Sequence, residues 1–297
     1  MGSGIDRSFD FLPLNEREGK PRKRGITEMR GPYYAPVGKR YLLDILETMG
    51  SYIDIFKFSG GSFSLMPKKA VQELIDTCHD HDVLVSTGGF IERVLTHGED
   101  AVSRYLEECR KMNFDVVEIS SGFITVPLDD LVHLVGKVTD LGMKPKPEVG
   151  IQFGAGGASS VEELEAEGTS DPSQAIRAAK RYLEAGAHLI MIESEGITEN
   201  VRTWRTDVVA KLVNELGLDK VMFEAAEPEV FSWYIKNFGP EVNLFVDHSQ
   251  VVQLECLRSG IWGTKSTWGR VVTYKEKGRR SAPARPKLVE PAAKGRR

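Results

Sequence analysis

Short apolar runs recur along this chain at intervals of roughly thirty residues, as expected for alternating strands and helices. Runs typical of buried strands lie at 53–58, 83–86, 116–119, 144–149, 189–192, 220–223 and 242–246, with a weaker one at 26–30. Amphipathic stretches with helical periodicity lie between them, at 67–78, 100–112, 128–141, 172–185, 208–216 and 251–258. The alternation predicts βαβ units and therefore a parallel sheet.

Eight such units predict a single closed (β/α)8 barrel, a TIM barrel. The 297 residues suit a barrel of about 250 residues with a tail at each end. We place the barrel at 25–272, between a charged N-terminal extension at 1–24 and a C-terminal tail at 273–297. A doubly wound open sheet is the alternative, but no Gly-x-Gly-x-x-Gly or Walker sequence supports a nucleotide-binding fold.

Charge is divided unevenly between the body and the tail. From Lys275 onward nine basic residues face two acids, a net charge of +7, so the formal −4 of the whole chain leaves −11 on residues 1–274. Such an acidic body is a poor general binder of nucleic acid, and the Pro- and Ala-rich tail is predicted to be disordered. No apolar run approaches the ~20 residues of a membrane span, and the three cysteines form no Cys-x-x-Cys pair. We therefore expect a cytoplasmic protein with reduced cysteines.

Four of the strand-like runs end in a glutamate. These residues are Glu118, Glu148, Glu193 and Glu224. The carboxyl ends of barrel strands form the rim on which active sites are built, so the four acids are expected to meet there. Carboxylates crowded on one rim repel each other unless a cation lies among them. Their oxygen atoms suit Mg²⁺ better than zinc, because no His-x-x-x-His run accompanies them.

Alternation along each strand sorts further side chains onto the interior face. By this alternation, Lys57 and Lys146 lie on the same face as the four glutamates. Thr87 is placed on that face too, together with Val85 of the same strand. The lysines would then bind an anionic substrate, or one would serve as the amine of a Schiff-base aldolase. The structural alternative is a buried ion-pair network in which Lys57 or Lys146 is held between glutamates.

Glycine and hydroxyl residues follow three of the strands, where free N–H groups and hydroxyls can hold an anion. Thr87, Gly88 and Ser120 are the predicted substrate contacts from these turns, and His248 is a further one after the last strand. The stretch from Gly154 to about residue 170 is long for a connection between a strand and a helix. It is either a lid or a disordered insertion.

The order of motifs resembles the phosphosulfolactate synthase family over about 25–272. The motifs are YIDIFKFSGG at 52–61, STGGFIE at 86–92, FDVVEISSG at 114–122, PEVG at 147–150, AGAHLIMIE at 185–193, KVMFEA at 220–225 and VNL at 242–244. Members of this family are (β/α)8 barrels that use Mg²⁺ to add sulfite to phosphoenolpyruvate. The family includes plant heat-stress-associated proteins, linked to acquired thermotolerance, and this chain is similar in type to that branch.

The resemblance implies a lyase-type addition of sulfite, or another nucleophile, to phosphoenolpyruvate or a related small carboxylate. Mg²⁺ held by Glu148 and Glu193 would stabilise the charge that develops on the substrate. The implied catalytic residues are Lys57, Glu118, Glu148 and Glu224. The resemblance also implies a homo-oligomer.

Two motifs depart from the synthase pattern. That pattern has a pair of lysines after Glu-Val-Gly, one of them the proposed proton donor, where this chain has Ile151 and Gln152. It has Glu-Gly-Arg where this chain has Glu195 in place of the arginine. Losing these cations disfavours a phosphorylated, doubly anionic ligand. Two hypotheses follow: a divergent Mg²⁺-dependent lyase, or a non-catalytic barrel that acts through protein partners in heat-stress tolerance.

Overall fold

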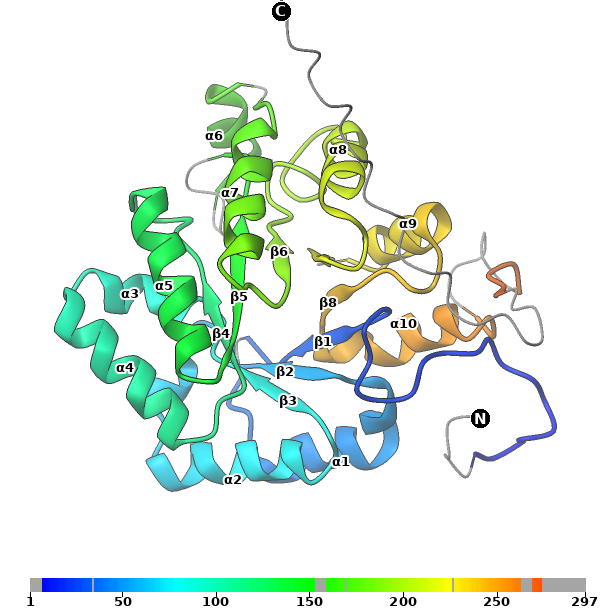
Figure 1. Ribbon diagram of the computed structural model, residues 1–297. Helices are drawn as coiled ribbons and strands as arrows, with labels where there is room; N and C mark the ends of the chain where they lie inside the picture. Colours follow the sequence, from blue (N-terminus) through cyan, green and yellow to red (C-terminus); the bar gives the residue numbers. More distant parts are fainter. Residues whose placement is uncertain are drawn as a thin grey trace, which may run out of the picture.

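The computed structural model describes residues 7–33, 35–152, 159–168, 170–225, 227–262 and 269–273. Eight parallel strands pair in chain order, and β8 pairs with β1, so the sheet closes into a barrel (Figure 1). The strands are β1 (Thr27–Arg30), β2 (Ile55–Lys57), β3 (Leu84–Ser86), β4 (Val116–Ile119), β5 (Lys144–Val149), β6 (Ile190–Ile192), β7 (Val221–Glu224) and β8 (Leu244–Asp247). The predicted (β/α)8 barrel is confirmed, and the open sheet is excluded because no strand is left at an edge.

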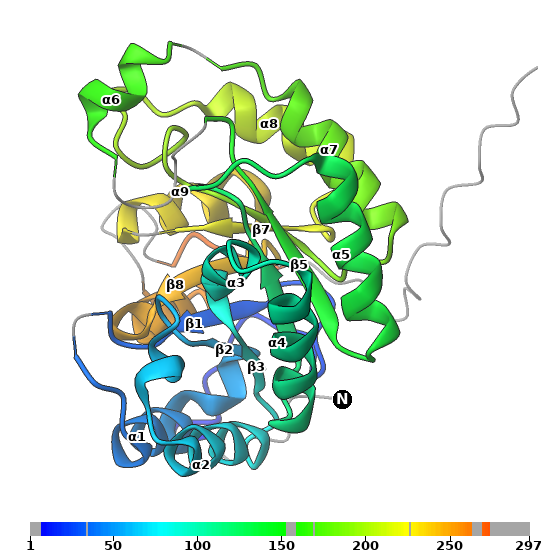
Figure 2. The ribbon, with the colours of Figure 1, turned by 90° about the vertical axis from the view of Figure 1, so that its left-hand side faces the viewer.

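Helices on the outside of the barrel connect the strands (Figures 1 and 2). They are α1 (Lys39–Met49), α2 (Lys68–His79), α3 (Ile91–Leu95), α4 (Glu99–Lys111), α5 (Leu128–Asp140), α6 (Val161–Ala166), α7 (Ser173–Glu184), α8 (Thr206–Leu216), α9 (Pro228–Phe238) and α10 (Val251–Arg258). Short 3-10 helices are η1 (Gly50–Tyr52), η2 (Ser62–Leu65), η3 (Gly88–Phe90) and η4 (His248–Gln250). The six predicted helices match α2, α4, α5, α7, α8 and α10 to within two residues at each end. No helix in the described ranges is long and apolar enough to cross a membrane.

Apolar side chains form two separate layers on the two faces of the sheet. Inside the barrel, one cluster contains Ile26, Ile55, Val116, Leu189, Met191, Met222 and Phe245. A larger cluster fills the space between the sheet and the helices. Because both faces are covered, the strands are apolar on both sides, as is usual for parallel sheets.

The interior face of β3 is one residue out of phase with the prediction. Lys57 on β2 aligns with Ser86 on β3, and Ser86 aligns with Val116 of the interior cluster. Val85 lies in the outer layer. The prediction that Val85 and Thr87 face the interior is therefore wrong. The run 83–85 is apolar throughout, so it has no polar alternation from which the face could be read.

The N-terminal extension, described from residue 7, lies against the base of the barrel. The ammonium of Lys20 donates to three main-chain carbonyls, those of Gly50, His81 and Asp82. The guanidinium of Arg22 binds Asp54 at 2.8 Å. In Figure 1 this stretch is dark blue and passes beside α10. The predicted disordered tail is 273–297, of which residues 274–297 lie outside the described part of the chain.

Candidate active site

Three of the predicted acids lie at the carboxyl ends of three neighbouring strands. Glu148 is in β5, Glu224 ends β7, and Glu193 directly follows β6. Glu148 aligns with Met191, so Glu193 lies two residues further toward the rim, where its N–H donates to the carbonyl of Val149 at 3.1 Å. Alternate residues of aligned parallel strands point to the same face, so the structure brings these carboxyl groups together on the interior side of the rim.

The fourth acid, Glu118 of β4, lies deeper and pairs with both lysines. Its Oε1 is 2.8 Å from the ammonium of Lys57, and its Oε2 is 3.0 Å from that of Lys146. Lys146 also forms an ion pair with Glu28 of β1, and neither of these two side chains has any exposed surface. Glu28 is a residue that the sequence reasoning missed. Glu28 lies in the weakest of the predicted strands, 26–30. Its sequence context does not indicate a partner such as Lys146, which is 118 residues away.

The two lysines therefore differ in access. Lys146 belongs to a buried ion-pair network, as in the structural alternative, and its role in substrate binding stays a prediction. Lys57 has 12% of its side chain exposed. Burial tends to lower the pKa of Lys57, but the charges of Glu118, Glu148 and Glu224 outweigh it and raise that pKa above its ordinary value. The Lys57 ammonium therefore stays charged and can contact an anionic ligand.

The carboxyl groups of the rim divide into one whose pKa is lowered and three whose pKa values are raised. Burial tends to raise the pKa of Glu118, but Lys57 and Lys146 lower it to about 2. Burial, together with the charges of Glu118 and Glu224, raises the pKa of Glu148 to about 8. Burial and then the charges of Glu224 and Glu148 raise the pKa of Glu193 well above its usual range. Burial also raises the pKa of Glu224. A site of this kind favours the binding of positive charge.

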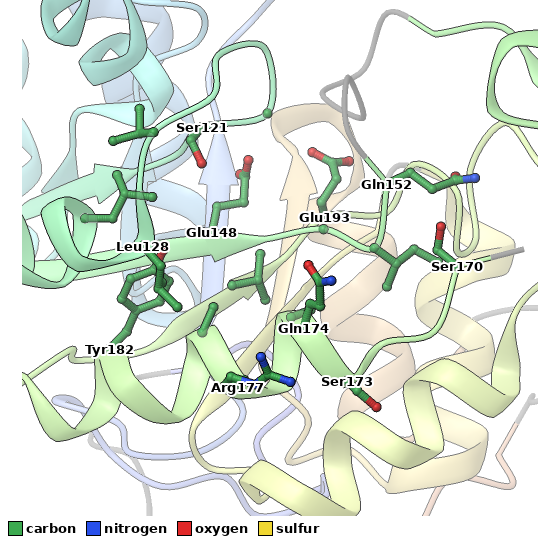
Figure 3. Close-up of a pocket in the computed structure, with 18 of the residues that line it drawn as sticks. Ser121, Leu128, Glu148, Gln152, Ser170, Ser173, Gln174, Arg177, Tyr182 and Glu193 are labelled. Carbon is green, nitrogen blue, oxygen red and sulfur yellow. The ribbon is translucent and has the colours of Figure 1, made fainter. Parts of the chain in front are cut away.

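A cavity of about 850 Å³ opens from these acids (Figure 3). Glu148 and Glu193 line its inner end, and its wall continues between α5 and α7. Figure 3 shows the two carboxylates on one side of the end of β5 and helix α7 on the other. Sites for small molecules commonly enclose about 300–1,000 Å³. The volume and the lining are therefore those of a ligand site.

The residues at the inner end fit Mg²⁺. This ion usually takes one or two protein carboxylates and keeps water or substrate oxygens at its other positions. Glu148 and Glu193 offer carboxylate oxygens on one cavity wall. A cation there would offset the charge repulsion that, after burial, contributes to their raised pKa values. Over the described ranges, no group of three or more His, Cys, Asp or Glu side chains is placed to hold a metal ion. A cation would therefore depend on the two carboxylates plus solvent or substrate.

The turn after β3 lies close to the ion-pair network. Gly88 has a φ of +62°, and a Cβ there would lie 2.5 Å from a main-chain carbonyl oxygen, so glycine is required. A Cβ on Gly89 would lie 2.8 Å from Oγ of Ser120. The Ser120 side chain is buried, and its hydroxyl has no hydrogen-bond partner among the described residues. The hydroxyl of Thr87 instead donates to the carbonyl of Gly88 and accepts the N–H of Glu118. Thr87 thus braces this turn. Ser120 is not among the residues that line the cavity, and its contact with a substrate stays a prediction.

His248 lies in a different polar cluster, after β8. Its Nδ1 is hydrogen bonded to the hydroxyl of Tyr41, and the adjacent Asp247 binds Arg30 at 2.8 Å. β8 pairs with β1, whereas the cavity opens from β5 and β6, and His248 is not among the residues that line it. The predicted contact between His248 and a substrate stays a prediction.

Two of the three residues that depart from the synthase pattern, Gln152 and Glu195, hold the connection between β5 and α7. The amide of Gln152 donates to the carbonyls of Leu164 and Gly168 at 2.9 and 3.0 Å. Glu195 is fully buried, and its carboxylate accepts the N–H of Ser159 at 2.9 Å. The predicted long loop therefore contains a helix, α6, over part of its length. Residues 153–158 and 169 of that stretch lie outside the described ranges.

Two arginines near this connection form ion pairs outside the cavity. Arg202 pairs with Glu165 at 3.2 Å, and Arg205 pairs with Asp207 at 2.9 Å. Both arginines precede α8, in the loop after β6. Neither lines the cavity beside Glu148 and Glu193.

Comparison with known proteins identifies the family. A family model described as (2R)-phospho-3-sulfolactate synthase (ComA) matches residues 15–264. The chain belongs to this family. A protein of Arabidopsis thaliana named HEAT-STRESS-ASSOCIATED 32 is 40% identical over 258 residues, which cover 84% of this chain and 90% of that protein. The phosphosulfolactate synthase of Methanothermobacter thermautotrophicus is 28% identical over 271 residues, covering 89% and 98% respectively.

Solved structures show the same fold at much lower identity. The carboxyl transferase domain of Rhizobium etli pyruvate carboxylase, solved with pyruvate, has a TM-score of 0.50 and 12% identity. The match covers 77% of this chain and 40% of that one. This similarity concerns the barrel alone.

Proposed function

We propose that this protein is a Mg²⁺-dependent lyase of the phosphosulfolactate synthase type, which adds a nucleophile to the double bond of a small carboxylate. The observation that carries the proposal is the cluster of Glu148, Glu193 and Glu224 at three neighbouring strand ends, with Lys57 near it. The cavity at this cluster and the family of the chain support it. Phosphoenolpyruvate and sulfite are the reference substrates, and no nucleic acid or membrane is expected to take part.

Glu148 and Glu193 would hold the Mg²⁺. Bound there, the cation supplies electrostatic stabilisation of the negative charge that develops on the substrate carboxylate. Glu118 holds the ammonium of Lys57 at 2.8 Å, which fixes its position while leaving part of its surface exposed. Lys57 then binds and orients a second anionic group of the substrate. The free hydroxyl of Ser120 adds a hydrogen bond on the same side.

The bond changes require one proton. Sulfite attacks the methylene carbon, a carbon–sulfur bond forms, and the electron pair of the double bond moves to the adjacent carbon, which takes up a proton. Glu224 is the proposed donor, because it ends β7 beside Glu148 and Glu193 and burial raises its pKa. Gln152 cannot serve, because an amide is not an acid near neutral pH and its N–H groups bind Leu164 and Gly168.

The Schiff-base aldolase is disfavoured by the same geometry. An amine must lose its proton to attack a carbonyl, and such lysines have lowered pKa values. Lys57 has a raised pKa. Lys146 has no exposed surface and is held between Glu28 and Glu118.

The test is a direct assay. Purified protein is incubated with Mg²⁺, phosphoenolpyruvate and sulfite, and phosphosulfolactate is followed by ³¹P NMR. We expect turnover that EDTA abolishes and that Glu148→Gln reduces on the order of a hundredfold or more. Glu184→Gln, an exposed acid at the end of α7, is the matched control and retains full activity. Absence of both turnover and Mg²⁺-dependent binding of phosphoenolpyruvate would refute the proposal.

A second function is favoured by the residues that replace the expected cations. Gln152 and Glu195 hold α6 and its flanking residues in place. The relative of 40% identity carries a name that refers to heat stress. In this alternative the barrel, as a homo-oligomer, acts through protein partners in heat tolerance. Glu148→Gln would then leave a heat-tolerance phenotype of the host intact, and loss of the phenotype would contradict this reading. Light scattering after size exclusion tests the oligomer.

A further inference from the structure

The cavity at the rim is much larger than a three-carbon acid requires. Its volume of about 850 Å³ corresponds to about 28 water molecules at ~30 Å³ each. Phosphoenolpyruvate has on the order of ten non-hydrogen atoms, far fewer than the drug-sized ligands that such cavities enclose. The surplus space lies between α5 and α7, beyond Glu148 and Glu193 (Figure 3).

Apolar side chains line the middle of this space. Leu128 and Leu131 belong to α5, and Ala178 and Tyr182 belong to α7. Each pair is three or four residues apart, so its members share one face of their helix. Facing apolar walls of this kind favour a hydrocarbon segment of a ligand over a charged one.

One cation that lines the cavity has no partner among the described residues. Arg177 lines the cavity and is exposed, and within the described ranges it forms no ion pair or hydrogen bond. Gln174 lies three residues earlier on the same face of α7. The nearby acid Asp171 binds Lys211 at 3.2 Å. The positive charge of Arg177 is therefore available to a ligand, and a guanidinium suits a carboxylate.

We infer that this site takes an elongated diacid. Its first acidic group binds at Glu148 and Glu193 through the cation, its apolar spacer lies between α5 and α7, and its second acidic group binds Arg177. The first of these contacts depends on the proposed function, whereas the other two depend only on the cavity. The substrate class is then a carboxylate with a hydrocarbon body that ends in a second acid.

A series of ligands of increasing length tests the inference. The probes are the α,ω-dicarboxylates from malonate to suberate and the monocarboxylates of the same lengths, titrated calorimetrically with Mg²⁺ present. We expect affinity to rise with length by up to about fourfold per methylene in both series. The longer diacids should gain about a further tenfold over the monoacids, from the charge-assisted contact with Arg177.

Substitutions test which residues account for the gain in affinity. Arg177→Gln should lower the affinity of the long diacids about tenfold, to that of the monoacids of the same length. Arg181→Gln, one turn further along α7 and paired with Asp129, is the matched control and should change nothing. Ala178→Leu fills the apolar part and should remove the gain with length, with thermal unfolding used to check the fold.

The outcomes separate this inference from the proposed function. The inference of an elongated diacid would be overturned if affinity did not rise with ligand length. It would also be overturned if Arg177→Gln lowered the affinity of long and short acids equally. Length-dependent binding that needs no Mg²⁺ and survives Glu148→Gln would support the outer cavity while removing the metal-dependent role of its inner end.

Discussion

Charged side chains are buried at both ends of this barrel, but their partners differ. At the base, three cations of the N-terminal stretch have partners: Arg17 binds Glu255, Arg22 binds Asp54, and Lys20 binds three carbonyls. At the opposite end, five carboxyl groups face two lysines. The acids are Glu28, Glu118, Glu148, Glu193 and Glu224, and the lysines are Lys57 and Lys146.

This difference indicates what each end does. Matched charges at the base join distant segments and contribute to stability, because Arg17 and Arg22 each pair with an acid there. Unmatched carboxyl groups at the rim cost stability and raise pKa values, which is typical of functional sites. Within the rim, the contrast recurs on a smaller scale, since Glu118 is compensated by two lysines while Glu148 and Glu193 are not.

The largest effect is expected where a balanced buried charge is removed. Lys146→Met leaves the carboxylates of Glu28 and Glu118 without one of their cations, and should lower the free energy of unfolding by about 3 to 5 kcal/mol. Urea unfolding at neutral pH measures it. Lys144→Met, on the same strand, is the control and should cost far less. A loss below about 1 kcal/mol for Lys146→Met, as for an exposed pair, would contradict the buried network.

At the base, Lys20→Met removes one ammonium from three carbonyl oxygens. It should lower the free energy of unfolding by about 1 to 3 kcal/mol, because the carbonyls lose their donor. Lys23→Met, an exposed neighbour, should be neutral in the same experiment. Equal effects of the two substitutions would show that the base does not depend on this contact.

At the rim, removing a charged side chain should raise the free energy of unfolding rather than lower it. The folded-state pKa of Glu148 is about 8, above its ordinary 4.5. The folded protein therefore holds this proton more tightly than the unfolded chain, and wild-type stability falls as pH rises from about 4.5 to 8. Without metal at pH 8, Glu148→Gln should raise the free energy of unfolding by on the order of 2 kcal/mol, because solvent screens part of the penalty. Added Mg²⁺ should stabilise the wild type and not the variant. Destabilisation of metal-free protein by Glu148→Gln would remove the contrast between base and rim.

The smallest global effect is expected at Gln152. Gln152→Ala removes two hydrogen bonds to the segment 159–168 and should cost about 1 kcal/mol of global stability or less. Limited proteolysis within that segment should nevertheless become faster, because local opening is easier than global unfolding. Gln253→Ala on α10 is the control. Unchanged cleavage would mean that Gln152 does not hold the connection.

The parts of the fold that were predictable are those encoded by local pattern. The bounds of β4 and β5 agree with the predicted ranges 116–119 and 144–149, because apolar runs with clear ends mark them. The face of β3 was predicted wrongly, because 83–85 is uniformly apolar and only its alignment with Lys57 and Val116 sets the register. Glu28 was missed for a related reason, since its partner Lys146 comes from a strand across the barrel.

By itself, the sequence determined the barrel, its strand and helix pattern and the glutamates at the strand ends, because these depend on periodicity and on residues adjacent in the chain. Tertiary structure decided which charges compensate one another. Closure of the sheet placed Lys146 between Glu28 and Glu118, left Lys57 at the edge of the rim, and turned Gln152 and Glu195 toward α6 and its flanking residues. Electrostatic balance depends on distance and burial in three dimensions, and neither is set by spacing along the chain.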